Sequence, residues 1–340
     1  MRKIIPLLLA LVLALTGISA FAQEDISGRL VLYSSMTDND LNNLIDSFGE
    51  LYPDVEIEIV NGSGGELLAR IRAEKENPQG DVMWGALSNS DGDTHSDLFL
   101  HWLSEYEDEI MDDYKSGNGF YNLDHLSTVV FAVNVELEKE LGLDIRTYED
   151  LLDPKLSGRI YVADPNSSSS AWNNLSNIFA VYGNDSPEAW AIVEGLMKNK
   201  MVIGTSSSVA FKGVNDGEYV VGLTYEDGAA TLLKAGSDQI RIQYPENGAS
   251  AFAFGVAVIQ GAQNEAAAKA LVSYLMSAEG QSDLGTRLGT LRFTNKNAQY
   301  DTPYLPKSEE IKWVYRDMDW LTQNREDILK KWNELYAANY

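Results

Sequence analysis

The sequence predicts an α/β protein built from two lobes. Between residues 30 and 84, short apolar runs typical of buried strands alternate with amphipathic helical stretches, separated by short turns. This β-α-β-α-β order is typical of a parallel sheet covered by helices. A second series with the same order begins near residue 159. A chain of 340 residues, 44% of them hydrophobic, is long enough to bury two cores.

Residues 1–22 have the features of a secretory signal peptide. Arg2 and Lys3 precede an apolar stretch over residues 7–15, and a small-x-small cleavage site follows at residues 20–22. The apolar stretch is shorter than the roughly 20 residues that span a bilayer. The chain has no cysteine, which excludes a lipid-modified cysteine and disulfides. We therefore expect an exported protein that is soluble in the periplasm, without direct membrane insertion.

The first lobe begins with a strand-helix-strand-helix-strand series. We expect strands over residues 30–33, 55–60 and 81–84, and helices whose apolar faces carry Leu41, Leu44 and Phe48 in one case and Leu67, Leu68 and Ile71 in the other. A further helical stretch is expected around residues 97–115. The long β-branched run at 126–135 is interpreted as the crossing into the second lobe.

The second lobe repeats the pattern. Strands are expected at residues 159–163, 202–203 and 219–224, and helices at 171–181, 187–199, 209–215 and from 226 to 234. The apolar run at 251–259 is the expected return crossing. We therefore assign residues 27–128 plus 250–290 to lobe 1, residues 129–249 to lobe 2, and residues 291–340 to a C-terminal helical segment packed on the lobes. In that segment Trp313, Trp320 and Trp332 are expected to be packing anchors.

Clusters of serine and glycine stand where strand patterns give way to helix patterns. A helix start exposes unpaired N–H groups and the positive end of the helix dipole, so it can bind an anion. Four such clusters predict a pocket for a phosphate, phosphonate or carboxylate, although each could also be an ordinary cap or turn. The candidate ligand-binding residues in them are Ser34, Ser35, Ser63, Gly64, Ser169, Ser170, Ser207 and Ser208.

Charge and motifs exclude several classes of function. The formal net charge of −25 at pH 7 disfavours nucleic acid and anionic membranes as partners, because both attract basic patches. A small anionic solute remains compatible with local binding through N–H and hydroxyl groups. The sequence has no G-x-S-x-G elbow, no H-E-x-x-H, no P-loop and no cysteine nucleophile. We therefore expect no catalytic residues, and the three histidines lack the spacing of metal ligands.

The stretch from Gly62 to Ile71, followed by Asn77-Pro78 and by Asp81 to Trp84, resembles periplasmic solute-binding proteins of ABC importers. More narrowly, it is similar to the ferric-iron-binding group and its relatives that take up hexose phosphates or 2-aminoethylphosphonate. The resemblance implies the type II two-lobe fold, with two crossover strands and hinge closure over the ligand. It also implies an inner-membrane ABC permease as partner, and we expect a monomer without a cofactor.

Within this group, the resemblance implies an anion pocket without a metal. Iron-binding members use a histidine in the first loop, a carboxylate in the third-strand loop and a tandem tyrosine in the second lobe. Here the loops at residues 33–36 and 84–88 lack the histidine and the acid, and a single Tyr225 stands before Glu226 and Asp227. We therefore expect a hexose phosphate or 2-aminoethylphosphonate as ligand, with ferric ion as the alternative. Tyr225, Glu226 and Asp227 are expected to face the end of the ligand away from its anionic group.

Overall fold

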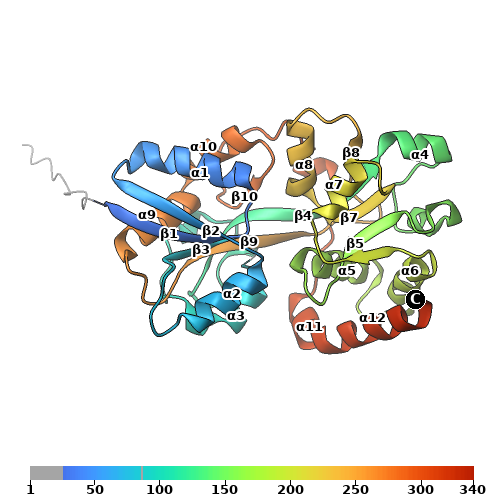
Figure 1. The fold of residues 1–340 in the computed structure, drawn as a ribbon, viewed down its shortest axis with the longest axis horizontal. Helices are drawn as coiled ribbons and strands as arrows, with labels where there is room; N and C mark the ends of the chain where they lie inside the picture. The colour runs from blue at the N-terminus through green and yellow to red at the C-terminus, as the bar shows by residue number, and fades with distance from the viewer. Residues whose placement is uncertain (1–25, 86) are drawn as a thin grey trace, which may run out of the picture.

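Two lobes lie side by side and are joined by long strands (Figure 1). The computed structural model describes residues 26–85 and 87–340, so the predicted signal peptide lies outside the described residues. The strand β4 (Asn122–Asn134) pairs with β9 (Ala251–Val258) up to Thr128 and with β7 (Val221–Tyr225) from Val129 onward. One strand therefore belongs to both lobes, which places the boundary between them within a continuous sheet.

Lobe 1 is a sheet of order β2-β1-β3-β9-β4, with β10 on β4. Its first three strands are parallel, and β9 runs antiparallel to β3. The strands and helices are β1 (Gly28–Ser34), α1 (Asp38–Leu51), β2 (Val55–Asn61), α2 (Gly64–Ala73), β3 (Val82–Trp84), α3 (Asn89–Thr94), α9 (Glu265–Met276), α10 (Ala278–Leu288) and β10 (Arg292–Phe293). Leu32, Leu44 and Phe48 are fully buried between this sheet and its helices.

Lobe 2 continues the sheet in the order β4-β7-β5-β6, with β8 also on β4. The strands β5, β6 and β7 are parallel to one another. The remaining elements are α4 (Val135–Leu141), β5 (Ile160–Ala163), α5 (Ser169–Tyr182), α6 (Pro187–Lys198), β6 (Val202–Gly204), α7 (Val209–Asn215), α8 (Glu226–Lys234) and β8 (Ile240–Gln243). Phe131, Leu175 and Val193 are buried in a second core, as the two apolar series predict.

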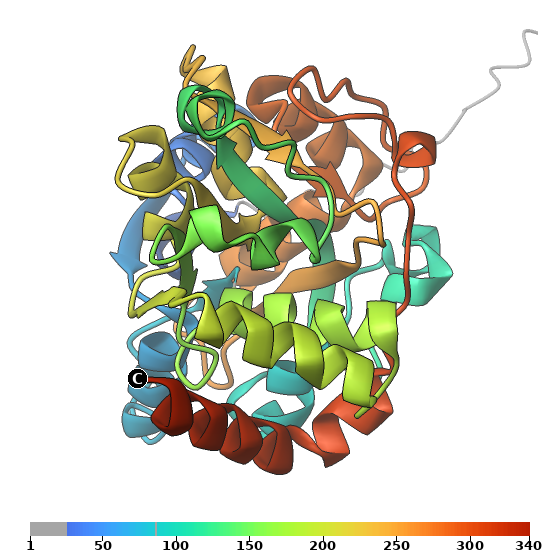
Figure 2. The ribbon, with the colours of Figure 1, turned by 90° about the vertical axis from the view of Figure 1, so that its right-hand side faces the viewer.

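The C-terminal segment crosses from lobe 1 to lobe 2. After β10 the chain runs along the cleft side to α11 (Met318–Gln323) and α12 (Arg325–Asn339), which lies against α6 on the outside of lobe 2 (Figure 2). Trp332 is buried in the core of lobe 2 and Trp320 packs on Phe179, as expected of packing anchors. Trp313 differs, because it stands before α11 and lines the cleft between the lobes.

The expected helical stretch around residues 97–115 is three isolated 3-10 turns. They span Ser96–Leu98, Glu107–Glu109 and Asp112–Tyr114, and further 3-10 turns span Asp150–Leu152, Pro154–Leu156 and Ser308–Glu310. Six acidic residues between 105 and 113 would repel one another at helical spacing. Ile110, which is fully buried, anchors the stretch to lobe 1 in an extended conformation.

Candidate functional site: a cleft between the lobes

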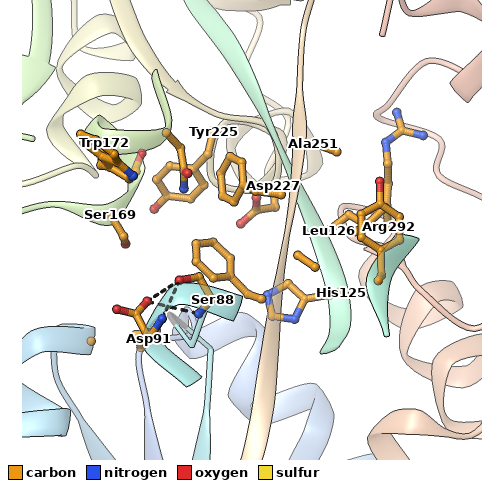
Figure 3. A pocket seen from close by; sticks show the side chains of 18 of the residues that line it. Ser88, Asp91, His125, Leu126, Ser169, Trp172, Tyr225, Asp227, Ala251 and Arg292 are labelled. Carbon is orange, nitrogen blue, oxygen red and sulfur yellow. Dashed lines mark hydrogen bonds between the residues drawn. The ribbon is translucent and has the colours of Figure 1, made fainter. Parts of the chain in front are cut away.

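A large cleft separates the lobes and is lined by both of them and by the C-terminal segment. Its volume is about 1690 Å³. Pockets for small molecules typically measure roughly 300–1,000 Å³, so a small solute would fill only part of the cleft in this state. Figure 3 shows Ser169, Trp172 and Tyr225 above Ser88 and Asp91, with Asp227 beside Tyr225 and His125 to the right of Ser88.

Strand order explains why residues far apart in sequence line one cleft. In lobe 1 the adjacent parallel strands β2, β1 and β3 all end at this edge, and in lobe 2 the strands β6, β5 and β7 do the same. Ligands of open α/β sheets bind at the carboxyl ends of the strands. The predicted residues that line the cleft are Ser35, Ser63, Gly64, Ser169, Ser170, Ser207, Tyr225 and Asp227.

Two of the predicted serines, Ser34 and Ser208, do not line the cleft. Ser34 is fully buried; its Oγ donates to the carbonyl of Trp84 at 2.9 Å and accepts from the N–H of Met36 at 3.1 Å. The Oγ of Ser208 lies 3.0 Å from the Oγ of Ser206. We therefore leave both out of the ligand set, because their hydroxyls are engaged within the protein.

Glu226 is also absent from the cleft lining, although the sequence interpretation placed it beside the ligand. Its buried carboxylate lies 3.0 and 3.1 Å from the Nε of Arg292 and accepts a hydrogen bond from the hydroxyl of Tyr244. Thr128 donates to it at 3.4 Å. Burial raises the pKa of Glu226, and Arg292 opposes that rise. Glu226 joins α8 to β4 and β10, so its role is structural.

Three helices of lobe 1, α1, α2 and α3, begin with capping boxes that contain an acid. Thr37 and Asp40 cap α1, Ser63 and Glu66 cap α2, and Ser88 and Asp91 cap α3. Each acid accepts hydrogen bonds from the N–H and the hydroxyl of its cap residue, as in the 2.7 Å contact from the Oγ of Ser63 to Oε2 of Glu66. These carboxylates already supply the negative charge that a helix N-terminus attracts.

The N-terminus of α5 in lobe 2 is different. Ser168 caps it by accepting from the N–H of Ala171 at 3.3 Å, and its first turn contains no acidic residue. Asn174 ties the helix to β7 by donating to the carbonyl of Thr224 at 3.1 Å. Next to this helix, the loop after β6 brings Ser207 into the same cleft. Of the long helices that the structure describes at the cleft, α5 therefore has an N-terminus suited to an external anion.

Acidic side chains line another part of the cleft. The Oγ of Ser127 donates to Oδ1 of Asp227 at 2.5 Å, and burial raises the pKa of Asp227 to about 7. One carboxylate oxygen of Asp40 is buried without a hydrogen-bond partner, and burial raises the pKa of this group as well. Carboxylates accept hydrogen bonds from hydroxyl or ammonium groups and repel a phosphate. The cleft therefore has chemically distinct ends.

Among the cleft residues that the sequence interpretation missed, Arg316 stands out because it carries a positive charge. It lies in the irregular segment before α11, where no periodic pattern or motif marks it. Its side chain contacts α5 through Asn173 and β9 through the carbonyl of Ala251. Burial lowers the pKa of Arg316 to about 10, so the guanidinium remains charged at neutral pH.

Two features, a metal-binding cluster and a membrane-spanning helix, are absent from residues 26–85 and 87–340. No group of three or more His, Asp or Glu side chains there is arranged to hold a metal ion. None of the helices described there is long and apolar enough to cross a membrane.

The fold and the cleft define a two-lobe solute-binding protein, a non-enzymatic component of transport. The chain belongs to the family described as "Bacterial extracellular solute-binding protein", whose model matches residues 43–312. The periplasmic binding protein AfuA from Actinobacillus pleuropneumoniae, solved with fructose-6-phosphate bound, is 27% identical. It covers 91% of this chain and 99% of its own length, with a TM-score of 0.79. The predicted family and type II fold are therefore confirmed.

Other relatives have names that refer to different solutes. Iron uptake protein A1 of Synechocystis is 26% identical over 74% of this chain and 72% of its own. A Salmonella typhi protein that carries the name of a 2-aminoethylphosphonate-binding periplasmic protein is 24% identical over 67% of this chain and 66% of its own. Members of this family work with ABC permeases to import solutes.

Proposed function

We propose that this chain is the periplasmic binding component of an ABC importer and captures a small phosphorylated or phosphonate solute in the cleft. The observation that carries the proposal is the N-terminus of α5, which borders the cleft with Ser169 and Ser170 and has no acid in its first turn. Hexose phosphates and 2-aminoethylphosphonate are the leading ligands. The signal-like residues 1–22 support a periplasmic location.

Binding of the solute with micromolar affinity requires several contacts, because each contact contributes only a small free energy. A helix N-terminus contributes about 0.3–1 kcal/mol to a surface anion and up to about 2 when partly buried. Hydrogen bonds to a charged group add about 1.5–3 kcal/mol each. Micromolar binding corresponds to about −8 kcal/mol, so contacts from more than one cluster are needed. Hinge closure would bring lobe 1 onto a solute held by lobe 2 and shift the protein to a closed state.

Ferric ion is the alternative ligand, supported by the iron uptake relative. Iron coordination by Tyr225 requires its phenolate. Burial raises the pKa of Tyr225, and Asp227 raises it further, so the free protein holds the phenol protonated. Binding of a ferric ion would therefore have to displace this proton, a step that binding of a phosphorylated solute does not require.

A thermal-shift titration of the mature protein tests the proposal. Glucose 6-phosphate, fructose 6-phosphate, 2-aminoethylphosphonate, inorganic phosphate and ferric citrate are compared. Saturable stabilisation by a phosphate ester or a phosphonate is expected. A response to ferric citrate alone, with a tyrosinate–iron absorption band, would overturn the proposal in favour of iron binding.

The double variant Ser169→Ala/Ser207→Ala then tests the serine clusters. Loss of two hydroxyl donors to a charged ligand is expected to weaken binding well beyond tenfold, or about 3 kcal/mol at 1.5 kcal/mol each. Ser157→Ala, an exposed serine of lobe 2 outside the cleft, serves as the control. Unchanged affinity in the double variant would remove these serines from the site.

A further inference from the structure

Arg316 reaches the cleft from the C-terminal segment and has no charged partner among the contacts described. Two of its five N–H groups are used: Nη1 donates to Oδ1 of Asn173, and Nη2 lies 3.4 Å from the carbonyl of Ala251. The guanidinium also lies over the ring of Phe252, at 5.0 Å from its centroid. All three neighbours are uncharged, so the positive charge is not neutralised by the described residues.

Two other arginines that line the cleft are paired with acids. Arg292 is paired with Glu226 at 3.0 Å, and Arg72 is paired with Asp97 at 3.2 Å. For Arg316, by contrast, the Nε is buried and has no hydrogen-bond partner. Burying a charged donor without a partner is unfavourable, and a bound anion would relieve that cost.

The position of Arg316 relative to α5 shows where such an anion would bind. Its contact residue Asn173 follows Ser169 by four residues, so both lie on the same face of α5. A second cation, Arg325, lies 4.6 Å from the ring centroid of Trp172, which also lines the cleft near the first turn of α5. The uncompensated charge is therefore next to the N-terminus that lacks an acid.

We propose that Arg316 is the charged anchor for the oxyanion of the solute, which fixes the orientation of the ligand in the cleft. The oxyanion is held by α5 and the C-terminal segment, and the hydroxyl or ammonium groups of the solute point toward Asp227 and the capping acids of lobe 1. The inference rests on the proposed function and assigns one end of the ligand to each side of the cleft.

The chemistry of arginine suits this role. Its planar guanidinium presents several N–H donors in a fixed geometry that matches phosphate and phosphonate oxygens. Lysine would keep the charge but lose that geometry. Asp227 and Asp91 also line the cleft, and their carboxylates would repel an oxyanion placed beside them.

The test compares Arg316→Gln and Arg316→Lys with the unmodified protein by calorimetric titration. The ligands are glucose 6-phosphate and 2-aminoethylphosphonate. Arg316→Gln is expected to weaken binding of whichever of them binds by at least about thirtyfold, and Arg316→Lys by about five- to tenfold. Lys312→Gln is the matched control, since it removes one exposed charge from the same segment outside the cleft. Its affinity should stay within about twofold.

The melting temperature of the ligand-free variant distinguishes an effect on ligand binding from an effect on folding stability. Because Arg316 has no charged partner among the described residues, and its buried Nε has no hydrogen-bond partner, Arg316→Gln should not lower the melting temperature of the ligand-free protein. A lower melting temperature with unchanged affinity would mean a structural role and would overturn the inference, as would equal affinity of Arg316→Gln and the unmodified protein. Those results would leave the proposed function standing. If the unmodified protein binds neither phosphorylated compound, the proposed function and this inference both fail.

Discussion

The N-termini of α1, α2 and α3 in lobe 1 and that of α5 in lobe 2 all have a hydroxyl cap residue but differ in charge. In lobe 1, Asp40, Glu66 and Asp91 accept hydrogen bonds from the cap residues of α1, α2 and α3. In α5, Ser168 caps the helix and the first turn has no acid. A serine cluster at a helix start therefore suits an external anion only where the helix does not supply its own.

Because of this difference, the parts of the cleft lined by these helices offer different chemical groups to a ligand. Acids on the lobe 1 side offer acceptors for hydroxyl or ammonium groups, whereas α5 and Arg316 offer donors and positive charge. Lobe 2 is not uniform, because α8 also starts with two acids. Glu226 is neutralised by Arg292, but Asp227 lines the cleft. The contrast thus applies to individual helix starts rather than to whole lobes.

The largest expected effect comes from giving α5 an acid of its own. Ser169→Glu places a carboxylate at the exposed first position of the helix. Two like charges 4 Å apart repel by about 4 kcal/mol at an effective dielectric constant of 20, so we expect affinity for the phosphorylated solute to fall on the order of a hundredfold or more. The same substitution should stabilise the ligand-free protein by about 0.3–1 kcal/mol through the helix dipole.

Calorimetric titration and urea unfolding of the same preparation measure the two effects. Ser169→Gln is the matched control, since it has a similar size and no charge. If the glutamate and glutamine variants bind equally well, the charge of the first turn does not matter and the comparison fails.

An intermediate effect is expected from the acid that lines the cleft in lobe 2. Because the pKa of Asp227 is raised to about 7, the folded protein retains a proton that the unfolded chain releases near pH 4. Stability should therefore fall as the pH rises from about 4 through 7. Asp227→Asn removes this loss, which we expect to be on the order of 4 kcal/mol, since it amounts to about 1.4 kcal/mol for each pH unit between about 4 and 7.

Urea unfolding at pH 5 and pH 8 measures the change. The difference between the two pH values should be smaller in Asp227→Asn than in the unmodified protein. The exposed Asp216→Asn controls for loss of a lobe 2 carboxylate. Parallel pH profiles for Asp227→Asn and the unmodified protein would show that Asp227 is ionised in the folded state at pH 5.

The smallest effect should come from the reverse change in lobe 1. Glu66→Gln removes the charge of the capping box of α2 without removing its hydrogen-bond acceptor. The free energy of unfolding should fall only slightly, because this carboxylate is exposed to solvent, and affinity for a phosphorylated solute should stay within about twofold. Urea unfolding and titration measure both quantities. A tenfold gain in affinity would mean that the anion binds at α2 rather than at α5.

The sequence predicted much of the architecture because burial patterns are local. The strands of both series, the helices over 169–182 and 187–198, and the two long apolar crossings appear where the apolar periodicity indicates. The serine clusters fall at the carboxyl ends of parallel strands, where a cleft is expected. The helix expected around residues 97–115 was wrong, because clustered acids and a buried Ile110 favour an extended path.

The roles of individual polar side chains could not be predicted in the same way. Ser34 and Ser35 are neighbours, yet the first is buried and bonded to Trp84 while the second lines the cleft. Glu226 and Asp227 are also neighbours, and only the first meets Arg292, which lies 66 residues further along the chain. Whether a polar group is free to bind a ligand depends on such distant partners.

By itself the sequence determined the two-lobe α/β class and the edge of the sheet where a ligand would bind, since these follow from hydrophobic periodicity and local caps. The family followed from the resemblance of residues 62–84 to solute-binding proteins of ABC importers. The tertiary structure decided which helix starts carry their own acid at the cleft and where the charge of Arg316 lies. The physical reason is that the groups within a few ångströms of a charge determine whether it is neutralised or available to a ligand. For Arg316 those neighbours, Asn173 and Ala251, come from other parts of the chain.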